Sequence, residues 1–242
     1  MPRTKSQSDI AAIKASAHVA EKAVLEVIAY LRSSNQSSSE AAKEVARTFL
    51  TQHGHVSPEG LIVAGGIRTA EPHFTGEGVL KPYTPIVIDI FPQSEATGFF
   101  ADISRTVCIG DPPERLRAMF AAVHAAQQAA VALLHPGVPC VDIHGAAVAV
   151  FESAGYETRG TGAEFTYAEG FVHSIGHGLG VDVHESPGLG AASTDILQVG
   201  DVVTVEPGLY YKDIGGVRIE DLFVITETGY TQLTTIPVFL QV

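Results

Sequence analysis

The chain has few cysteines and few basic residues, and each shortage excludes a class of protein. Cys108 and Cys140 are its only cysteines. Two thiols are too few for a disulfide scaffold, so we expect a protein of the reducing cytoplasm. The 15 Lys and Arg residues face 27 Asp and Glu residues, which gives a formal net charge of -12. Because nucleic-acid affinity depends largely on Lys and Arg, no nucleic-acid partner is expected.

Long apolar stretches are missing as well. Residues 1–10, MPRTKSQSDI, contain no apolar segment of the kind that a signal peptide needs, and no stretch reaches transmembrane length. We therefore expect a soluble, cytoplasmic protein with no membrane partner. The 242 residues and 45% hydrophobic content suffice for a large core without disulfides.

Predicted helices and strands follow the same order in both halves of the chain. Apolar spacing predicts an amphipathic helix over about 8–32, and Ser37 with Glu40 indicates a capping box for a second helix that Gly54 ends. The other predicted elements are strands at 61–66, 85–91 and 99–110, a turn at 94–98, helices at 114–135 and 141–154, and strands at 202–211 and 217–226. Each half therefore runs helix, helix, connection, hairpin.

This repeated order predicts one α+β domain over residues 1–242. Its half-repeats, at about 8–110 and 111–242, would share a sheet with helices outside it and be related by pseudo-twofold symmetry. The apolar closing segment, 234–242, is predicted to be a tucked-in strand or an interface. An interface there would allow a homodimer.

Each predicted hairpin carries one acid on either strand. The first holds Asp89 and Asp102, and the second holds Glu206 and Glu220. Residues equidistant from the turn of an antiparallel pair face each other, so this spacing sets acid against acid. Two carboxylates about 5 Å apart repel by roughly 3 kcal/mol at an effective dielectric of about 20. A cation is therefore expected between them.

Two kinds of cation could lie there. Arg105 and Arg218 are near enough in sequence for one or two salt bridges, which would explain a single hairpin. Two equivalent hairpins and a histidine flanked by glycines instead suit two divalent ions such as Mn²⁺, Co²⁺ or Zn²⁺. Such a pair of ions would activate a shared water for attack on a carbonyl.

The stretch from Phe171 to Pro187 concentrates three histidines, His173, His177 and His184, among closely spaced glycines. Imidazole is a common metal ligand and proton carrier, and the glycines make an interior helix expensive, so strand or loop is predicted. One histidine would then be a metal ligand and the others would serve a substrate. The alternative is a polar glycine loop with incidental histidines.

The ordered set of Asp89, Asp102 in ADISRT, His177 in GHGLGVDVHE, Glu206 in VEPG and Glu220 in GVRIED resembles a known family. It is similar to the dinuclear metallopeptidases of pita-bread fold, which include methionyl aminopeptidase, prolidase and aminopeptidase P. The similarity covers nearly the whole chain. It implies a curved, mostly antiparallel sheet with outer helices and internal pseudo-twofold symmetry.

The same resemblance implies a ligand set and cofactors. Asp89 and Asp102 would bind one metal ion and bridge to the second, His177 would bind the second, and Glu206 and Glu220 would complete both shells. The cofactors would be two divalent ions. Mn²⁺ and Co²⁺ would be the preferred metals, and Zn²⁺ and Fe²⁺ the alternatives. A water would bridge them.

Further roles follow from the resemblance. Glu206 would also be the general base, His184 would contact the substrate and stabilise the tetrahedral intermediate, and His73 would line the pocket. His173 resembles the extra histidine of the proline-specific branch. Arg218, two positions before Glu220, resembles the arginine that orients substrate in prolidase and aminopeptidase P.

The implied function is metal-dependent exopeptidase activity on short peptides. The bond after the N-terminal residue would be cut, with proline preferred as the second residue, in an Xaa-Pro aminopeptidase or dipeptidase. One alternative is a methionyl aminopeptidase, although those enzymes lack the arginine. Another is a non-catalytic pita-bread module that binds peptides or proteins, although all five ligand positions are filled here.

Two departures from the family pattern bear on these expectations. The usual separation of the two aspartates is shorter by two residues, which predicts an expanded turn at 94–98. The proline-specific relatives carry an N-terminal domain before the catalytic one, and this sequence starts at the first catalytic-domain helix. That domain is expected to be absent.

Overall fold

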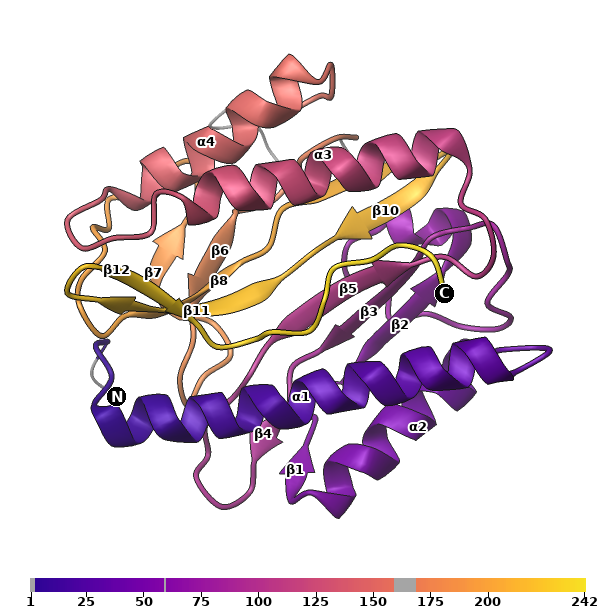
Figure 1. The fold of residues 1–242 in the computed structure, drawn as a ribbon, viewed down its shortest axis with the longest axis horizontal. Helices are drawn as coiled ribbons and strands as arrows, with labels where there is room; N and C mark the ends of the chain where they lie inside the picture. Colours follow the sequence, from indigo (N-terminus) through magenta and orange to yellow (C-terminus); the bar gives the residue numbers. More distant parts are fainter. Residues whose placement is uncertain (1–2, 59, 159–168) are drawn as a thin grey trace.

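The computed structural model describes residues 3–58, 60–158 and 169–242. Two helix pairs flank a central set of strands, and every pair of named strands that hydrogen-bond is antiparallel (Figure 1). The expected α+β pita-bread architecture is therefore confirmed. None of the described helices has the length and apolar character needed to cross a membrane.

The first half contains α1 (Gln7–Ser33), α2 (Ser39–Gln52), β1 (His55–Val56), β2 (Ile62–Gly65), the 3-10 helix η1 (Gly66–Ala70), β3 (Ile86–Ile90), β4 (Gln93–Ser94) and β5 (Ile103–Val107). The second half contains α3 (Glu114–Val131), α4 (Cys140–Ser153), β6 (Gly176–Gly178), β7 (Glu185–Leu189), β8 (Val202–Val205), β9 (Gly208–Tyr211), β10 (Gly215–Arg218), β11 (Asp221–Thr226) and β12 (Gly229–Gln232). Both halves thus begin with a helix pair and continue into strands.

The strands pair in a three-stranded sheet, β2-β3-β5, and a five-stranded sheet, β12-β11-β8-β6-β7, with the two-stranded pairs β10-β9 and β1-β4 beside them. A junction between β5 and β10 joins the two halves. There the Thr106 hydroxyl donates to the Arg218 carbonyl and accepts from the Arg218 N–H, each at 2.9 Å. The Glu220 N–H donates to the Ser104 carbonyl at 3.0 Å, which extends this junction.

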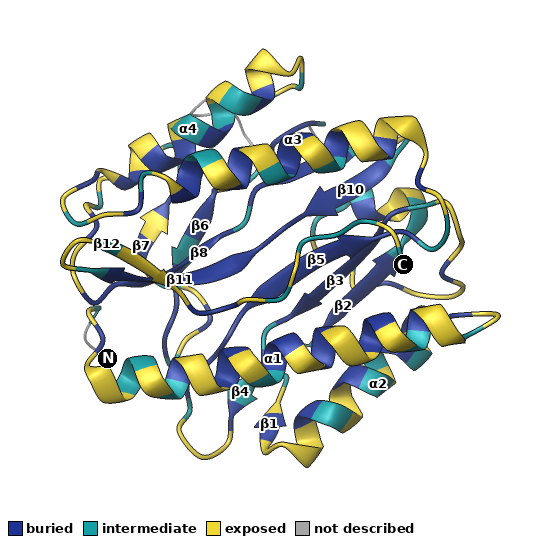
Figure 2. Cartoon of the chain, in the orientation of Figure 1, coloured by how far each residue is buried: buried dark blue, intermediate teal, exposed yellow. Residues whose placement is uncertain are grey.

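Each helix pair has its own apolar core. The buried face of α1, including Ile13, Val24 and Leu31, packs on the strands of the first half. Side chains of α3 and α4, including Met119 and Phe151, pack with those of the second half. Figure 2 shows the resulting pattern, in which the helices are buried on one side and exposed on the other while the central strands are buried throughout.

Several helix boundaries differ from those predicted. The N-cap of α2 is Ser38, whose hydroxyl accepts from Ala41 N–H, and Glu40 accepts instead from Gly78 N–H. The capping box predicted at Ser37 is therefore wrong, whereas Ser6 does cap α1 in this way, together with Asp9. The third helix ends at Val131 rather than at 135, because the chain tightens into i to i−3 hydrogen bonds ahead of Pro136.

The long strands predicted in the second half are each broken in two. Pro207 has no N–H and cannot continue a ladder, so 202–211 divides into β8 and β9. The opposite segment divides into β10 and β11 at the matching position. In the first half, the segment predicted as a strand over 99–110 is regular only in β5. The strand β7 extends beyond Pro187, where no strand was predicted.

The closing segment runs between α1 and α3 in the view of Figure 1. It forms a parallel bridge between Gln241 and Cys108, and Glu21 on α1 accepts hydrogen bonds from the backbone N–H groups of Thr235 and Ile236. The closing segment therefore packs against the rest of the domain, although it forms a single β-bridge rather than a strand.

Candidate metal centre

A cavity of about 540 Å³ lies where the two halves meet. The nine residues singled out in the sequence all line it: His73, Asp89, Asp102, His173, His177, His184, Glu206, Arg218 and Glu220. Leu61, Ile62, Phe91 and Val183 form an apolar part of the wall. One cavity therefore brings together acids, imidazoles and apolar side chains from both halves of the chain.

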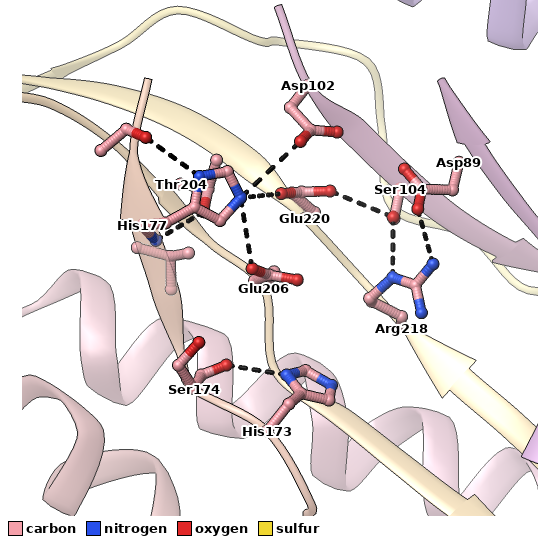
Figure 3. A network of polar contacts seen from close by, with 12 residues as sticks. Asp89, Asp102, Ser104, His173, Ser174, His177, Thr204, Glu206, Arg218 and Glu220 are labelled. Carbon is pink, nitrogen blue, oxygen red and sulfur yellow. Dashed lines mark hydrogen bonds and ion pairs between the residues drawn. The ribbon is translucent and has the colours of Figure 1, made fainter. Parts of the chain in front are cut away.

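Three acids surround one imidazole nitrogen in this cavity (Figure 3). His177 Nε2 lies 3.7 Å from Asp102 Oδ2, 3.5 Å from Glu206 Oε1 and 3.9 Å from Glu220 Oε1. Ligand atoms of Asp102, His177 and Glu220 all lie within 4.8 Å of one another. Two ligands of one metal ion, each at about 2.1 Å from it, are about 3 Å apart or slightly more. The spacing suits a metal ion better than direct hydrogen bonds.

The buried oxygens of these acids lack partners. Among the described residues, Asp89 Oδ1, Asp102 Oδ1 and Glu220 Oε1 have no hydrogen-bond partner. Leaving a buried charged group unsatisfied costs more than about 1–3 kcal/mol, so three such oxygens in one cavity call for a cation. The donor set of carboxylates with one imidazole fits divalent ions.

Burial and mutual repulsion act on the protonation of the acids. Burial raises the pKa of Glu206 to about 8, and it raises the pKa of Asp102 and Glu220 well above the usual range, helped by the neighbouring carboxylates. Burial lowers the pKa of His177 to about 4. The neutral His177 ring can donate from Nδ1 to the Gly178 carbonyl at 3.1 Å, which leaves the Nε2 lone pair facing the acids.

Without bound metal, the protein is expected to lose stability as pH rises from about 6.5 to about 8. Glu206 keeps a proton up to a pKa of about 8 in the folded protein, whereas the unfolded chain releases it near 4.5. Folding therefore becomes less favourable as this proton is lost, by up to about 1.4 kcal/mol per pH unit for each such carboxyl. Below 6.5, His173 and His177 act in the opposite direction, because burial lowers their pKa values to about 3 and about 4.

Urea unfolding of chelator-treated protein at pH 6.5 and pH 8 measures this change. Glu206→Gln removes one of the titrating groups and should reduce the slope. Equal or greater stability at pH 8 in the unaltered chain would contradict the prediction.

Backbone breaks position the two glutamates. Glu206 follows β8 and donates its N–H to the Ile175 carbonyl at 2.7 Å, and Glu220 lies between β10 and β11. Val205 pairs with Asp221 and Gly208 with Arg218, so Glu206 and Glu220 occupy equivalent places across the hairpin. The opposition of acids predicted for this hairpin follows the observed register.

The first hairpin has a different register from the one predicted. Asp89 pairs with Ser104, and Asp102 lies just before the first residue of β5, two residues from the position opposite Asp89. The reason is the irregular chain before β5, where Phe100 donates to Gly180 and Ala101 to Pro92. Residues at such diagonal positions still share one face of the sheet. Both carboxylates consequently reach the cavity.

The two arginines weighed as counter-ions have separate roles. Arg218 Nη2 pairs with Asp89 Oδ2 at 2.7 Å, so the salt-bridge alternative holds for this acid. Arg105 pairs with Asp221 and also donates to the Glu220 carbonyl, which supports the backbone of Glu220 rather than its charge. Within the described chain, no Lys or Arg forms an ion pair with Asp102, Glu206 or Glu220.

Tyr210 is a buried residue that contacts two cavity residues, and the sequence interpretation missed it. Its hydroxyl contacts His173 Nε2 at 2.9 Å and accepts from Arg218 Nη1 at 3.0 Å. A Cβ on Gly208 would lie 2.5 Å from this hydroxyl, so glycine is required there for the approach. No local signal in the sequence marks Tyr210, because the chain breaks at Pro207 and the period of two does not run from Glu206 to Tyr210.

The sequence profile of metallopeptidase family M24 matches residues 11–227. An Xaa-Pro dipeptidase of Pyrococcus horikoshii is 33% identical over 232 residues, which cover 95% of this chain and 62% of the relative. The chain thus spans about three-fifths of the length of that relative.

Two solved structures are similar throughout the described chain. The prolidase from Pyrococcus horikoshii OT3 has a TM-score of 0.88 at 30% identity, covering 98% of this chain and 65% of that one. The X-Pro aminopeptidase from Thermotoga maritima MSB8 has a TM-score of 0.87 at 30% identity, covering 99% and 65%.

Proposed function

Because the chain belongs to metallopeptidase family M24, we propose that it is a metal-dependent exopeptidase that cuts the bond after the first residue of short peptides, with proline preferred as the second. The observation that carries the proposal is the cavity in which acids of both hairpins surround His177 Nε2. The Xaa-Pro preference draws on the relatives described above and on Arg218 and His173.

We assign the metal ligands to Asp89, Asp102, His177, Glu206 and Glu220. The unpartnered oxygens of three of these acids support the assignment. Two divalent ions such as Mn²⁺ or Co²⁺, when bound there, would activate a water and polarise the carbonyl of the scissile bond. Asp89 differs from the others because Arg218 already neutralises one of its oxygens.

Glu206 is the proposed general base. Its side chain is 17% exposed, against 7% for Asp102 and 2% for Glu220, so it is the acid of this cluster most open to the cavity. A carboxylate at the cavity wall can take a proton from the attacking water at an Oε atom and deliver it to the leaving nitrogen. General bases near neutral pH work best when burial has raised their pKa.

Two exposed histidines are proposed to contact the substrate. The His184 ring lies 4.3 Å from the His177 ring, edge to face, and His73 lines the same cavity from the connection between η1 and β3. An imidazole N–H here can donate to the carbonyl oxygen as negative charge develops on it.

His173 is proposed to recognise the proline ring by packing. Its Nδ1 contacts the Ser174 carbonyl at 2.7 Å and its Nε2 contacts the Tyr210 hydroxyl, so both nitrogens are engaged. The ring then offers carbon edges and a face to the cavity, which suits an apolar pyrrolidine better than a polar side chain. This preference agrees with the apolar part of the wall.

Arg218 is proposed to act mainly by holding other groups. Four of its N–H groups donate, to Ser104, Pro72, Tyr210 and Asp89. Because a guanidinium has five such donors, one remains for the substrate. Orientation of Asp89 and of the Tyr210–His173 pair is the larger part of its expected contribution.

Tyr210→Phe is expected to lower kcat/KM by roughly tenfold, because a hydrogen bond to a charged group is worth about 1.5–3 kcal/mol and His173 also loses its partner. Steady-state kinetics on an Xaa-Pro peptide would measure the effect. Tyr230→Phe, on an exposed strand position, is the matched control. An unchanged kcat/KM in the first variant would remove Tyr210 from the site.

Hydrolysis assays with protein of known metal content test the function. Mn²⁺- or Co²⁺-loaded protein should cut Xaa-Pro dipeptides, Xaa-Pro-Yaa peptides or both, and leave Xaa-Ala-Yaa peptides nearly intact. Cleavage of Met-initiated peptides alone would favour a methionyl aminopeptidase. Less than one metal ion per chain with no cleavage of any peptide would favour a binding module.

A further inference from the structure

A buried cation near the start of the chain lies beneath the turn that leads to His184. The Lys5 side chain is only 1% exposed, and its ammonium group donates to the Glu185 carboxylate and, at 2.7 Å, to the Arg3 carbonyl. The Lys5 N–H donates to the Gly200 carbonyl at 2.8 Å. Lys5 is thus fixed by both its backbone and its side chain, 180 positions away from Glu185.

Glu185 connects this cation to the site. It directly follows His184, starts β7, and pairs with Gly178, the residue after His177. A register shift separates the His177 and Gly178 pairings, so the backbone is irregular here. The backbone of Glu185 is therefore tied to the strand that carries His177, while its side chain is tied to Lys5.

The ion pair packs directly against the turn between the two histidines. A Cβ on Gly180 would lie 2.5 Å from Glu185 Oε2 and 2.9 Å from Lys5 Cε. Gly180 itself donates its N–H to the Asp182 carbonyl at 3.1 Å and accepts from Phe100 N–H at 2.8 Å. Lys5 and Glu185 together therefore pack against this turn at Gly180.

The His184 ring depends on that backbone for its orientation. It is exposed, and the hydrogen bonds of the described residues include none to its ring nitrogens. Removing the Lys5 charge would leave Glu185 half-buried and unpaired, and breaking such a pair is strongly unfavourable. The carboxylate would turn toward water and move the adjoining His184.

We propose that Lys5 is a positioning residue that, through Glu185, holds the 179–185 turn so that His184 faces the cavity. The inference deepens the proposed function, since it depends on His184 contacting the substrate. It assigns a catalytic contribution to a side chain that does not line the cavity.

A double-mutant cycle with His184 tests the proposal. Lys5→Met keeps the side-chain volume and is expected to lower kcat/KM for an Xaa-Pro-Yaa peptide by about 10–100-fold, the usual cost of a misplaced group. Lys5→Arg keeps the charge and should recover part of the lost kcat/KM, although the larger guanidinium must fit where a side chain is only 1% exposed. In a His184→Ala background, Lys5→Met should change kcat/KM by less than about twofold. Lys14→Met, on the exposed side of α1, is the matched control.

A purely structural role predicts different results. Lys5→Met would then lower kcat/KM by the same factor with and without His184, and this outcome overturns the proposal. Should Lys5→Met fold poorly, the neutral pair Lys5→Met with Glu185→Gln removes both charges and avoids a buried unpaired one. This neutral double variant should fold and should still show a lower kcat/KM. That loss should disappear in a His184→Ala background.

Hydrogen exchange separates failure of this proposal from failure of the proposed function. In chelator-treated protein, Lys5→Met should speed amide exchange in residues 179–189 by at least about tenfold, and Lys14→Met should not. Unchanged exchange in that segment overturns the positioning role whether or not any peptide is cut. An unaltered chain that cuts no peptide while exchange responds as expected contradicts the exopeptidase function alone.

Discussion

Glu206→Gln is expected to lower kcat by about 10³-fold, within the range that general acid–base catalysis contributes. An amide of the same shape can still offer an oxygen to a metal ion, but it cannot take the proton of the attacking water. Glu206 is the acid of the His177 cluster most open to the cavity, which is why the loss should fall on turnover. Steady-state kinetics on an Xaa-Pro peptide at saturating Mn²⁺ would measure it, with metal analysis of the same sample.

Glu227→Gln serves as the control, since Glu227 is exposed near the β11–β12 turn. That substitution should leave both kcat and metal content unchanged. If Glu206→Gln keeps more than a tenth of the activity with its metal bound, Glu206 is not the base. A variant that loses metal along with activity would show only its role as a ligand.

Removing divalent ions is expected to abolish peptide hydrolysis, and adding Mn²⁺ or Co²⁺ back should restore it. The physical reason is the set of buried carboxylate oxygens without partners, which a bound cation would satisfy. The same ions should stabilise the fold by about 2.7 kcal/mol when present at 100 times their dissociation constant. Thermal unfolding with and without metal would measure this stabilisation of the fold.

His177→Ala distinguishes a specific site from general binding of cations to an acidic protein. The variant should lose most of the metal-dependent rise in unfolding temperature, because the ion loses its nitrogen ligand. Asp213→Asn, which alters an exposed acid paired with Arg115, should keep the rise. Full hydrolysis by chelator-treated protein, with negligible metal by elemental analysis, would show that the reaction needs no metal.

Residue order was enough to predict the architecture and the members of the candidate site. Titratable groups in apolar strands or between glycines are energetically unfavourable and are expected there only where a function requires them. Five such groups stand out in the sequence: Asp89, Asp102, His177, Glu206 and Glu220. The family resemblance drawn from these motifs is confirmed by the match over residues 11–227. Their roles as ligands and as base remain proposals, which the experiments above address.

What the sequence did not show are contacts between distant segments and local register. Nothing near Tyr210 marks it, because its importance comes from hydrogen bonds to His173 and Arg218 that exist only after folding. The pairing of Asp89 with Ser104 depends on how Phe100 and Ala101 fold back, which strand periodicity does not describe. Spacing therefore predicted that Asp89 and Asp102 share a site in the cavity lining, but it placed them opposite each other, which the register does not.

Helix ends were missed for a related reason. Ser37 and Ser38 are adjacent, and both satisfy the residue preference for an N-cap. The choice between them was made by Glu40, which bonds to Gly78 on a distant loop instead of closing a capping box. Residue preferences reduced the candidates for the N-cap to Ser37 and Ser38, and the contact between Glu40 and Gly78 decided between them.

The junction of β5 with β10 has a consequence for synthesis of the protein on the ribosome. Asp89 and Asp102 leave the ribosome before His177, Glu206 and Glu220, and the Thr106–Arg218 contacts that join the halves cannot form until both segments are made. A nascent first half has two of the five proposed ligands and cannot hold an ion tightly. Metal loading would then be a late event in maturation, and a truncated chain would be unable to capture an ion and hydrolyse peptides prematurely.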